Sequence, residues 1–265
     1  MEQFFDSNGV SIRYVERGHG APVVLVHSYC GSFEGQFGRT GVADGLAQHY
    51  RVIGLDLRGH GGSAKPHDAA QYGVEMALDL VRLLDHLDLT RAHFLGYSLG
   101  AHIVAQLLTL HPERFTSATL GGACGRRHWT PADDARVETE AQEMEHGLLR
   151  TQLSRLGPPQ RPALDPVQVR ALSEKVLAGN DLLALAAIRR SNRAQVVTDA
   201  QMAAVRVPVL GIVGSQDPYV ARFRELQRLI ADMELVIIDG ARHDDAVAQP
   251  GFLHAALAFL AAHSA

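Results

Sequence analysis

Short, uninterrupted runs of apolar residues recur along the chain, and helical stretches separate most of them. Continuous apolar runs of this length are typical of strands that are buried on both faces of a sheet. A chain that alternates such strands with helices folds into a mainly parallel, twisted sheet covered by helices on both faces. The sequence therefore predicts an α/β fold. The expected strands are Val23–Val26, Val52–Leu55, His93–Gly96, Ala118–Leu120, Val209–Val213 and Leu235–Ile238.

The N-terminal segment has a different pattern. Phe4–Asp6 and Val10–Val15 flank Asn8-Gly9, which is the favoured pair for a two-residue hairpin turn. We therefore expect an antiparallel hairpin at the start of the sheet. The helices expected from a 3.6-residue apolar period or from apolar content cover Met76–Leu87, Leu99–Leu110, Phe223–Ile230 and Phe252–Ala262.

One long stretch interrupts the alternation of strands and helices. Between about residues 126 and 205 we find helical patterns and no good strand, and candidate helices cover Ala135–Leu149, Pro166–Ala178 and Asp181–Arg193. The sequence therefore predicts a core domain made of residues 1–125 and 206–265, with a small helical cap at 126–205 inserted between two strands.

Composition and charge exclude several classes of protein. With 46% hydrophobic residues, 20% charged residues and a net charge of −4, the chain resembles an ordinary globular protein and offers no basic surface for nucleic acid or for an acidic membrane. It has no signal-peptide pattern at its start and no apolar run of membrane-spanning length, and its two cysteines form no disulfide framework. We therefore expect a cytoplasmic protein.

The strongest chemical signal is Gly96-Tyr97-Ser98-Leu99-Gly100, which lies between an expected strand and an expected helix. A serine nucleophile needs this strand–turn–helix context, because a sharp turn projects its hydroxyl from the sheet. Glycines two positions before and after the serine avoid collisions with neighbouring backbone. The pattern predicts that Ser98 is a nucleophile.

A serine hydroxyl needs a base, and the base needs an acid that orients it. His243 follows the last expected strand and a glycine turn, and this position distinguishes it from the other histidines of the chain. Asp217 follows the strand at Val209–Val213. The chain order Ser98, Asp217, His243 is the one found in α/β-hydrolases. Other acids lie near His243 in sequence, and we interpret them as solvated loop acids or as a helix cap: Asp239, Asp244 and Asp245.

Together these motifs resemble the α/β-hydrolase superfamily over essentially the whole chain. Asp56–Ser63 is similar to the D-x-R-G-x-G-x-S loop of that family, Leu110–Phe115 to its helix-to-strand junction, and Val205–Val209 to the entry of its acid-bearing strand. Within the superfamily the chain looks closest to small capped esterases, enol-lactonases, carbon–carbon hydrolases and cofactor-free haloperoxidases. The match is specific for fold and triad and weak for substrate.

The resemblance also implies an oxyanion hole, formed by the backbone amides of Leu99 and Tyr29. The chain departs from the family here, because His27-Ser28 follows the strand where the family usually has His-Gly. If that position requires a positive φ, Ser28 costs on the order of 1–2 kcal/mol, and otherwise the loop takes a different path. Tyr29 either presents its hydroxyl to the site or only lines the pocket.

Two further residues are candidates for contact with substrate. Trp129, the only tryptophan, either packs in the core or lines the acyl pocket, and Leu148 either docks the cap or faces the substrate. We find no metal-ligand spacing and no phosphate-binding glycine loop, so no metal and no cofactor are implied.

The sequence thus predicts a serine-dependent hydrolase that cleaves carboxylic esters of small to medium size through an acyl-enzyme. A serine nucleophile disfavours epoxide hydrolase and haloalkane dehalogenase chemistry, for which the family uses aspartate. The alternatives are hydrolysis of a lactone or of a carbon–carbon bond in a β-diketone, and a ligand sensor with little turnover. The expected partner is a small-molecule ester, with neither nucleic acid nor membrane, and the expected oligomer is a monomer or homodimer.

Overall fold

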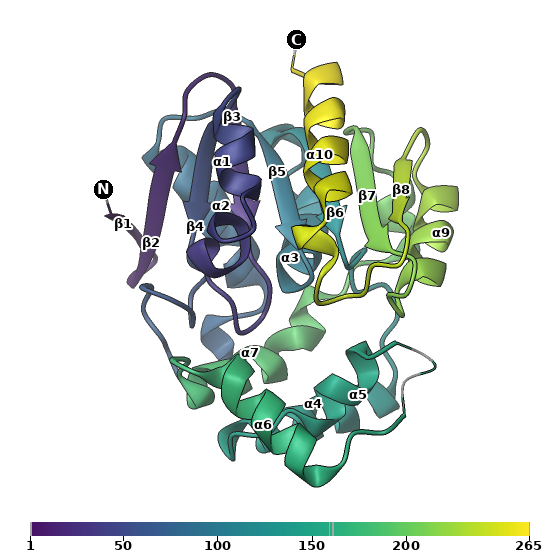
Figure 1. The fold of residues 1–265 in the computed structure, drawn as a ribbon. Helices are drawn as coiled ribbons and strands as arrows, with labels where there is room; N and C mark the ends of the chain where they lie inside the picture. Colours follow the sequence, from purple (N-terminus) through teal and green to yellow (C-terminus); the bar gives the residue numbers. More distant parts are fainter. Residues whose placement is uncertain (1, 159, 161, 265) are drawn as a thin grey trace.

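The chain forms an eight-stranded sheet in the order β1-β2-β4-β3-β5-β6-β7-β8 (Figure 1). The structure is a computed structural model that describes residues 2–158, 160 and 162–264. The strands are β1 (Gln3–Ser7), β2 (Val10–Arg17), β3 (Pro22–Val26), β4 (Arg51–Leu55), β5 (Ala92–Tyr97), β6 (Phe115–Gly121), β7 (Val209–Gly214) and β8 (Glu234–Ile238). Each strand predicted from the sequence is present, so the predicted α/β fold is confirmed.

The first two strands form the expected antiparallel hairpin. Asn8 and Gly9 both have positive φ, 57° and 82°, which is the backbone that a tight hairpin turn requires. β2 also pairs antiparallel with β4, and all later pairs in the sheet are parallel. The carboxyl ends of the parallel strands therefore share one edge of the sheet, which is where ligands bind in open α/β sheets.

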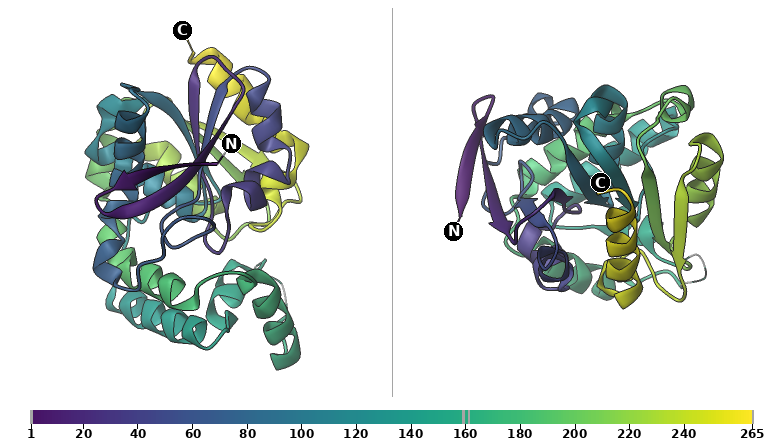
Figure 2. Two further views of the ribbon diagram at one scale, coloured as in Figure 1. Left: turned by 90° about the vertical axis from the view of Figure 1, so that its left-hand side faces the viewer. Right: turned by 90° about the horizontal axis from the view of Figure 1, so that it is seen from above.

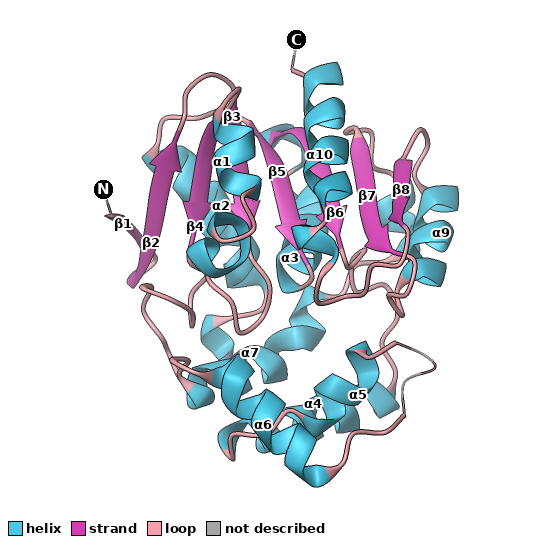
Figure 3. Ribbon diagram, viewed as in Figure 1, coloured by secondary structure: helices cyan, strands magenta, loops and turns pink. Residues whose placement is uncertain are grey.

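Helices cover both faces of the sheet (Figure 3). Buried side chains of α1 (Val42–Ala47) and α10 (Pro250–Ala262) pack on one face. Those of α2 (Val74–His86), α3 (Leu99–Leu110) and α9 (Val220–Leu229) pack on the other. Burial of these apolar faces supplies most of the driving force for folding. Short helical turns occur at η1 (Glu34–Gly38), η2 (Ala69–Gln71), η3 (Pro112–Arg114), η4 (Ser191–Gln195) and η5 (Ala246–Ala248).

Between β6 and β7 the described elements are helical, and most of them form a separate layer. The helical layer consists of α4 (Pro131–Glu145), α5 (Arg150–Leu156), α6 (Pro166–Leu177) and α7 (Leu182–Arg190), and α8 (Asp199–Ala203) follows and packs against α9. Figure 2 shows the layer beside the edge where the parallel strands end. In the described part of the chain, no helix is both long and apolar enough to cross a bilayer.

The first helix of the layer differs from the predicted range Ala135–Leu149. It begins earlier because Thr130 and Asp133 form a capping box and Pro131 occupies the first turn. It ends earlier because Gly147 has φ 71°, which leaves the helical region. The division of the chain into a core domain and a cap at 126–205 stays a prediction.

Candidate active site

Ser98 lies at the turn between β5 and α3, with φ 52° and ψ −107°. Such a conformation is strained for a residue with a side chain and is typical of functional sites. The backbone around Ser98 leaves no room for a side chain at Gly96 or Gly100. A Cβ at Gly96 would lie 2.4 Å from the oxygen of Gly100, and a Cβ at Gly100 would lie 2.0 Å from the oxygen of Val26. These close approaches let the strand turn into the helix at Ser98.

His243 lies in the loop after β8 and reaches the serine. Its Nε2 is 2.9 Å from Ser98 Oγ, and its Nδ1 is 2.8 Å from Asp217 Oδ2. Because a carboxylate only accepts hydrogen bonds, Nδ1 carries the proton and Nε2 is left to accept one from the serine hydroxyl. The hydroxyl of Tyr97 donates to the main-chain oxygen of His243 at 2.8 Å and fixes the loop.

Asp217 lies after β7 and is only 3% exposed. Its second oxygen, Oδ1, accepts a hydrogen bond of 2.8 Å from the amide of Tyr219. The loops after β7 and β8 lie close together, because Gly214 has no side chain to separate them: a Cβ there would meet the oxygen of Ala241 at 2.2 Å. The structure thus brings together the three residues that the sequence singled out, in a hydrogen-bonded line.

The acids that we interpreted as loop acids do not reach His243 Nδ1. Asp239 accepts a hydrogen bond of 3.3 Å from the hydroxyl of Ser215. Asp244 and Asp245 both pair with Arg242, at 3.0 and 2.9 Å. These contacts leave Asp217 as the acid at the imidazole.

The loop after β3 avoids the strain considered for Ser28. Positive φ occurs instead at Cys30, at 59°, so the loop takes a different path from the His-Gly pattern. His27 holds this path: its Nδ1 lies 2.7 Å from the oxygen of Ser28, and its Nε2 accepts from the amide of Leu57 at 3.0 Å. Burial lowers the pKa of His27, which keeps the ring neutral.

Two backbone amides at the site remain available to a ligand. Within the described part of the chain, neither the Leu99 amide nor the Tyr29 amide donates a hydrogen bond to another group. Leu99 is the first residue of α3, where the helix dipole favours negative charge. These amides can therefore donate to an oxygen that becomes negative beside Ser98.

A cavity of about 790 Å³ opens over Ser98 and His243. Its apolar wall comes from the helical layer, with Leu149, Leu153, Leu156, Leu172 and Val176. Leu148 is not among the lining residues, so the candidate contact at Leu148 is corrected to its neighbour Leu149, which points inward. Tyr29 lines the cavity with its ring, while its hydroxyl donates to the main-chain oxygen of Leu185.

Trp129 contacts a second, smaller cavity of about 90 Å³ and does not line the cavity over Ser98. Its indole Nε1 donates to Asp134 Oδ1 at 2.8 Å. The reading of Trp129 as a wall of the acyl pocket is therefore corrected. The indole ring is held beside α4 by this contact, outside the space above the serine.

The cysteines offer no competing nucleophile. Burial raises the pKa of the Cys30 thiol to about 12 and that of Cys124 to about 11, so both are protonated at neutral pH. In the described part of the chain, no three His, Cys, Asp or Glu side chains gather in a way that could hold a metal ion.

Sequence reasoning missed the polar side of the cavity, which is lined by His102, Arg126, Arg155, Arg189 and Tyr219. From the sequence we expected His102 to have a structural role and assigned none of these side chains to the site. A partial signal was present at Arg126, which follows closely after the apolar strand β6 and so lies at the functional edge of the sheet.

Comparisons with known proteins agree with this geometry. Residues 21–144 match the family model described as alpha/beta hydrolase fold. The chain is 30% identical over 219 residues to 3-oxoadipate enol-lactonase 2 of Acinetobacter baylyi, covering 78% of this chain and 77% of that protein. It is 36% identical over 124 residues to the dihydrolipoyllysine-residue acetyltransferase component of the acetoin cleaving system of Cupriavidus necator, covering 46% of this chain. The chain spans only 32% of the length of that relative.

Among solved structures, the enol-lactonase from Burkholderia xenovorans LB400 is similar to this chain with a TM-score of 0.80 and 23% identity. The likeness covers 98% of this chain and 100% of that one. At this identity it shows a shared fold.

Proposed function

The chain belongs to the α/β-hydrolase fold family, and on that premise we propose that it is a serine hydrolase of small to medium carboxylic esters. One observation carries the proposal. Ser98 Oγ, His243 Nε2 and Nδ1, and Asp217 Oδ2 form one line with steps of 2.9 and 2.8 Å, at a strained turn that faces a cavity. This is the arrangement that acyl transfer to a serine requires.

The proposed first half-reaction forms an acyl-enzyme. His243 Nε2 takes the proton of Ser98 as its oxygen attacks the ester carbonyl, and Asp217 stabilises the imidazolium that forms. The amides of Leu99 and Tyr29 donate to the oxyanion of the tetrahedral intermediate. The intermediate collapses when His243 gives its proton to the departing alkoxide, and the alcohol leaves.

The proposed second half-reaction repeats these roles with water. His243 takes a proton from a water molecule, whose oxygen attacks the acyl carbon, and the bond to Ser98 then breaks as the serine regains its proton. The product is the carboxylic acid, and the enzyme returns to its starting state. Each step uses side chains that are already in hydrogen-bond contact.

A lactone is the second candidate substrate class. The relative from Acinetobacter baylyi is named a 3-oxoadipate enol-lactonase, and it matches 78% of this chain. A lactone is a cyclic ester, so the same attack by Ser98 opens the ring and leaves the alcohol attached to the product. The two classes therefore differ in pocket shape and share the chemistry.

The test is a panel of short p-nitrophenyl esters and lactones, assayed with wild type and with Ser98→Ala. We expect many turnovers per wild-type molecule, no turnover in Ser98→Ala, and labelling of Ser98 by a phosphonate. Ser154→Ala is the matched control, because Ser154 is exposed on α5 and lies outside the cavity. Retained activity in Ser98→Ala, or a single turnover in wild type, contradicts the proposal.

A further inference from the structure

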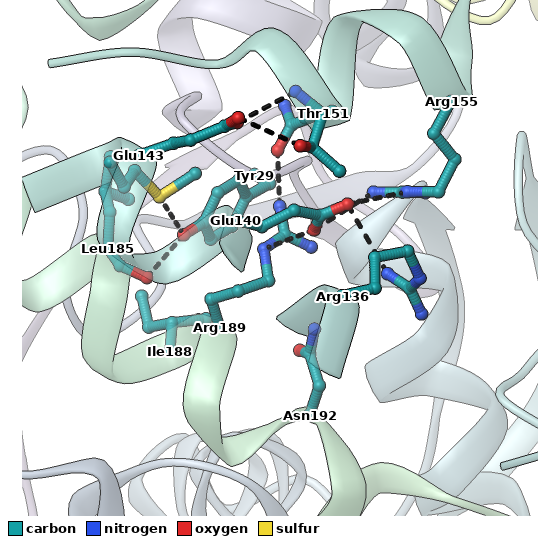
Figure 4. Close-up of polar contacts among 12 residues, drawn as sticks. Tyr29, Arg136, Glu140, Glu143, Thr151, Arg155, Leu185, Ile188, Arg189 and Asn192 are labelled. Carbon is teal, nitrogen blue, oxygen red and sulfur yellow. Dashed lines mark hydrogen bonds and ion pairs between the residues drawn. The ribbon is translucent and has the colours of Figure 1, made fainter. Parts of the chain in front are cut away.

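The polar side of the cavity over Ser98 is strongly cationic. Arg126, Arg155 and Arg189 all line it. Two of them form ion pairs with Glu140, a fully buried carboxylate of α4: Glu140 lies 2.9 Å from Arg155 Nε and 3.1 Å from Arg189 Nε. Figure 4 shows that the same carboxylate also receives Arg136. One buried carboxylate thus serves three guanidinium groups.

Arg126 takes no part in this ion-pair cluster. Its Nε lies 3.2 Å from the side-chain oxygen of Gln195, and its Nη2 lies 3.1 Å from that of Asn192. Both partners are neutral amides. In the described part of the chain, Arg126 forms no ion pair with a carboxylate. Its main chain is fixed as well, because its oxygen accepts from the amide of Val197 at 2.8 Å.

The adjacent residue shows how an arginine with a structural role is paired in this protein. Arg127 has a side chain only 3% exposed, and it contacts Asp199 at 2.9 Å and Glu225 at 3.3 Å. A buried charge is costly unless an opposite charge or strong hydrogen bonds compensate for it. Arg126 has hydrogen bonds that orient its guanidinium group and lacks the opposite charge. Accordingly, desolvation and the nearby Arg189 lower the pKa of Arg126 to about 9.

The other groups around Arg126 are suited to an anion. His102 and Tyr219 line the same part of the cavity, and His102 Nδ1 is buried without a hydrogen-bond partner among the described residues. His102 is only 7% exposed. Arg155 Nη1 lies 2.9 Å from the hydroxyl of Tyr219, which brings a second cation to this place. Among the described residues that line the cavity, Asp244 is the acid, and its carboxylate pairs with Arg242.

We propose that Arg126 binds a carboxylate of the substrate, so that the enzyme selects half-esters of short dicarboxylic acids over neutral esters. The proposal rests on the proposed ester hydrolysis and adds the substrate class. The substrate carboxylate supplies the negative charge that Arg126 lacks, and a guanidinium fork matches a carboxylate with two parallel hydrogen bonds. The ester group at the other end of the substrate then lies over Ser98, in the same cavity.

The first test compares two pairs of substrates, and the members of each pair differ in charge and by one methyl group. Monomethyl glutarate and monomethyl adipate carry a free carboxylate, and their dimethyl esters are neutral and of similar length. We expect wild-type kcat/KM for the half-esters to exceed that for the diesters by about tenfold or more, since hydrogen bonds to charged groups are worth at least this much. Equal values, or a preference for the diesters, overturn the proposal.

Variants locate the effect at Arg126. Arg126→Gln is expected to lower the half-ester to diester ratio of kcat/KM by roughly 10- to 100-fold. Arg126→Lys keeps the positive charge and loses the planar guanidinium fork. Its half-ester to diester ratio is therefore expected to lie between that of wild type and that of Arg126→Gln. Arg193→Gln is the matched control, because Arg193 is 72% exposed and outside the cavity; its ratio is expected to equal that of wild type. An unchanged ratio in Arg126→Gln overturns the proposal.

A binding measurement separates this inference from the proposed reaction. Glutarate and adipate are titrated calorimetrically into Ser98→Ala, which cannot turn over, with and without Arg126→Gln. We expect both anions to bind and Arg126→Gln to weaken binding about 10- to 100-fold. No binding, or equal binding in the double variant, refutes the carboxylate site even if ester hydrolysis is observed. Binding of the anions to Ser98→Ala, together with no turnover of any ester by the wild type, supports the site and contradicts the proposed reaction.

Discussion

The hydroxyl of Tyr29 donates a hydrogen bond to the main-chain oxygen of Leu185 and so connects the loop after β3 to helix α7. The guanidinium carbon of Arg189, one turn further along α7, lies 4.2 Å from the centre of the Tyr29 ring, a cation–π distance. Figure 4 marks the hydrogen bond between Tyr29 and Leu185 and also draws Arg189. The residue whose amide we propose as an oxyanion donor is therefore held by the helical layer, so the layer positions part of the site as well as enclosing it.

Tyr29→Phe tests this positioning role. The variant keeps the ring beside Arg189 and removes the hydrogen bond from the Tyr29 hydroxyl to the buried oxygen of Leu185, so we expect the free energy of unfolding to fall by about 0.5–1.5 kcal/mol. We also expect kcat to fall more than KM changes, because the amide of Tyr29 loses its support. Denaturant unfolding and steady-state kinetics measure the two effects.

Tyr72→Phe is the matched control for Tyr29→Phe. Tyr72 also donates its hydroxyl to a main-chain oxygen, that of Pro66 at 2.5 Å, and it does not line the cavity. We expect it to lose comparable stability and to keep its kcat. If Tyr29→Phe loses stability and keeps its kcat, the Tyr29 hydroxyl has a structural role only.

Asp217→Asn tests the acid. The amide side chain no longer provides the negative charge that stabilises the imidazolium, and it favours the wrong tautomer of His243. We therefore expect kcat to fall about 10³- to 10⁴-fold. Asp239→Asn is the control, because Asp239 contacts only the hydroxyl of Ser215 among the described side chains. If Asp239→Asn is the more damaging substitution, the wrong loop has been assigned.

The positions of the strands along the chain and the three residues of the hydrogen-bonded line follow from local sequence. The apolar runs at β3 to β8 are short, continuous and bounded by turn residues, so period and length identify them without knowledge of their partners. Gly96 and Gly100 identify the turn at Ser98 for a steric reason: the end of β5 and the start of α3 approach each other closely, and Gly100 also approaches Val26 of β3. His243 and Asp217 are identified because each follows a strand, and the carboxyl ends of parallel strands meet at one edge.

The contacts made by the helical layer do not follow from local sequence. Leu148 and Leu149 are adjacent and both apolar, and only Leu149 lines the cavity, where α5 packs against α4 and α6. Trp129 is fixed by Asp134, a contact that no periodicity encodes. Arg126 and Arg127 are identical in type, yet three-dimensional position gives carboxylates to Arg127 alone. Pairing between distant elements determines these roles.

We predict that the protein loses folding stability in acid, because the imidazole of His93 is buried. The ring lies between Ser117 Oγ at 2.7 Å and Ser264 Oγ at 3.2 Å, and burial lowers its pKa from 6.5 to about 4. Below pH 6.5 the unfolded chain gains a proton that the folded chain refuses until about pH 4, so folding stability falls across this window. The contribution is about 2 kcal/mol at pH 5.

Urea unfolding at pH 7 and pH 5 measures this loss. The wild type is expected to lose more than the contribution of His93 alone, because burial also lowers the pKa of His27, His60 and His102. His93→Gln should show a smaller difference between the two pH values than wild type does. His19→Gln, at an exposed position, should behave as wild type. An equal difference in His93→Gln and wild type would contradict the assignment.

The walls of the cavity predict the preferred length of the acyl group. Leu149, at the N-cap of α5, and Leu153 and Leu156 within α5 line its wall. The helical layer is held in place by contacts with the rest of the fold, at Tyr29 with Leu185 and at His67 with Asp181 (3.0 Å). A layer tied at several places does not lift as a lipase lid does. We therefore expect kcat/KM to be highest for short, water-soluble esters and to decline for long acyl chains. The measurement covers acyl lengths from two to sixteen carbons, below and above the critical micelle concentration of each ester. A maximum at the long end, or a jump in rate when micelles form, would show that the layer opens at a lipid interface.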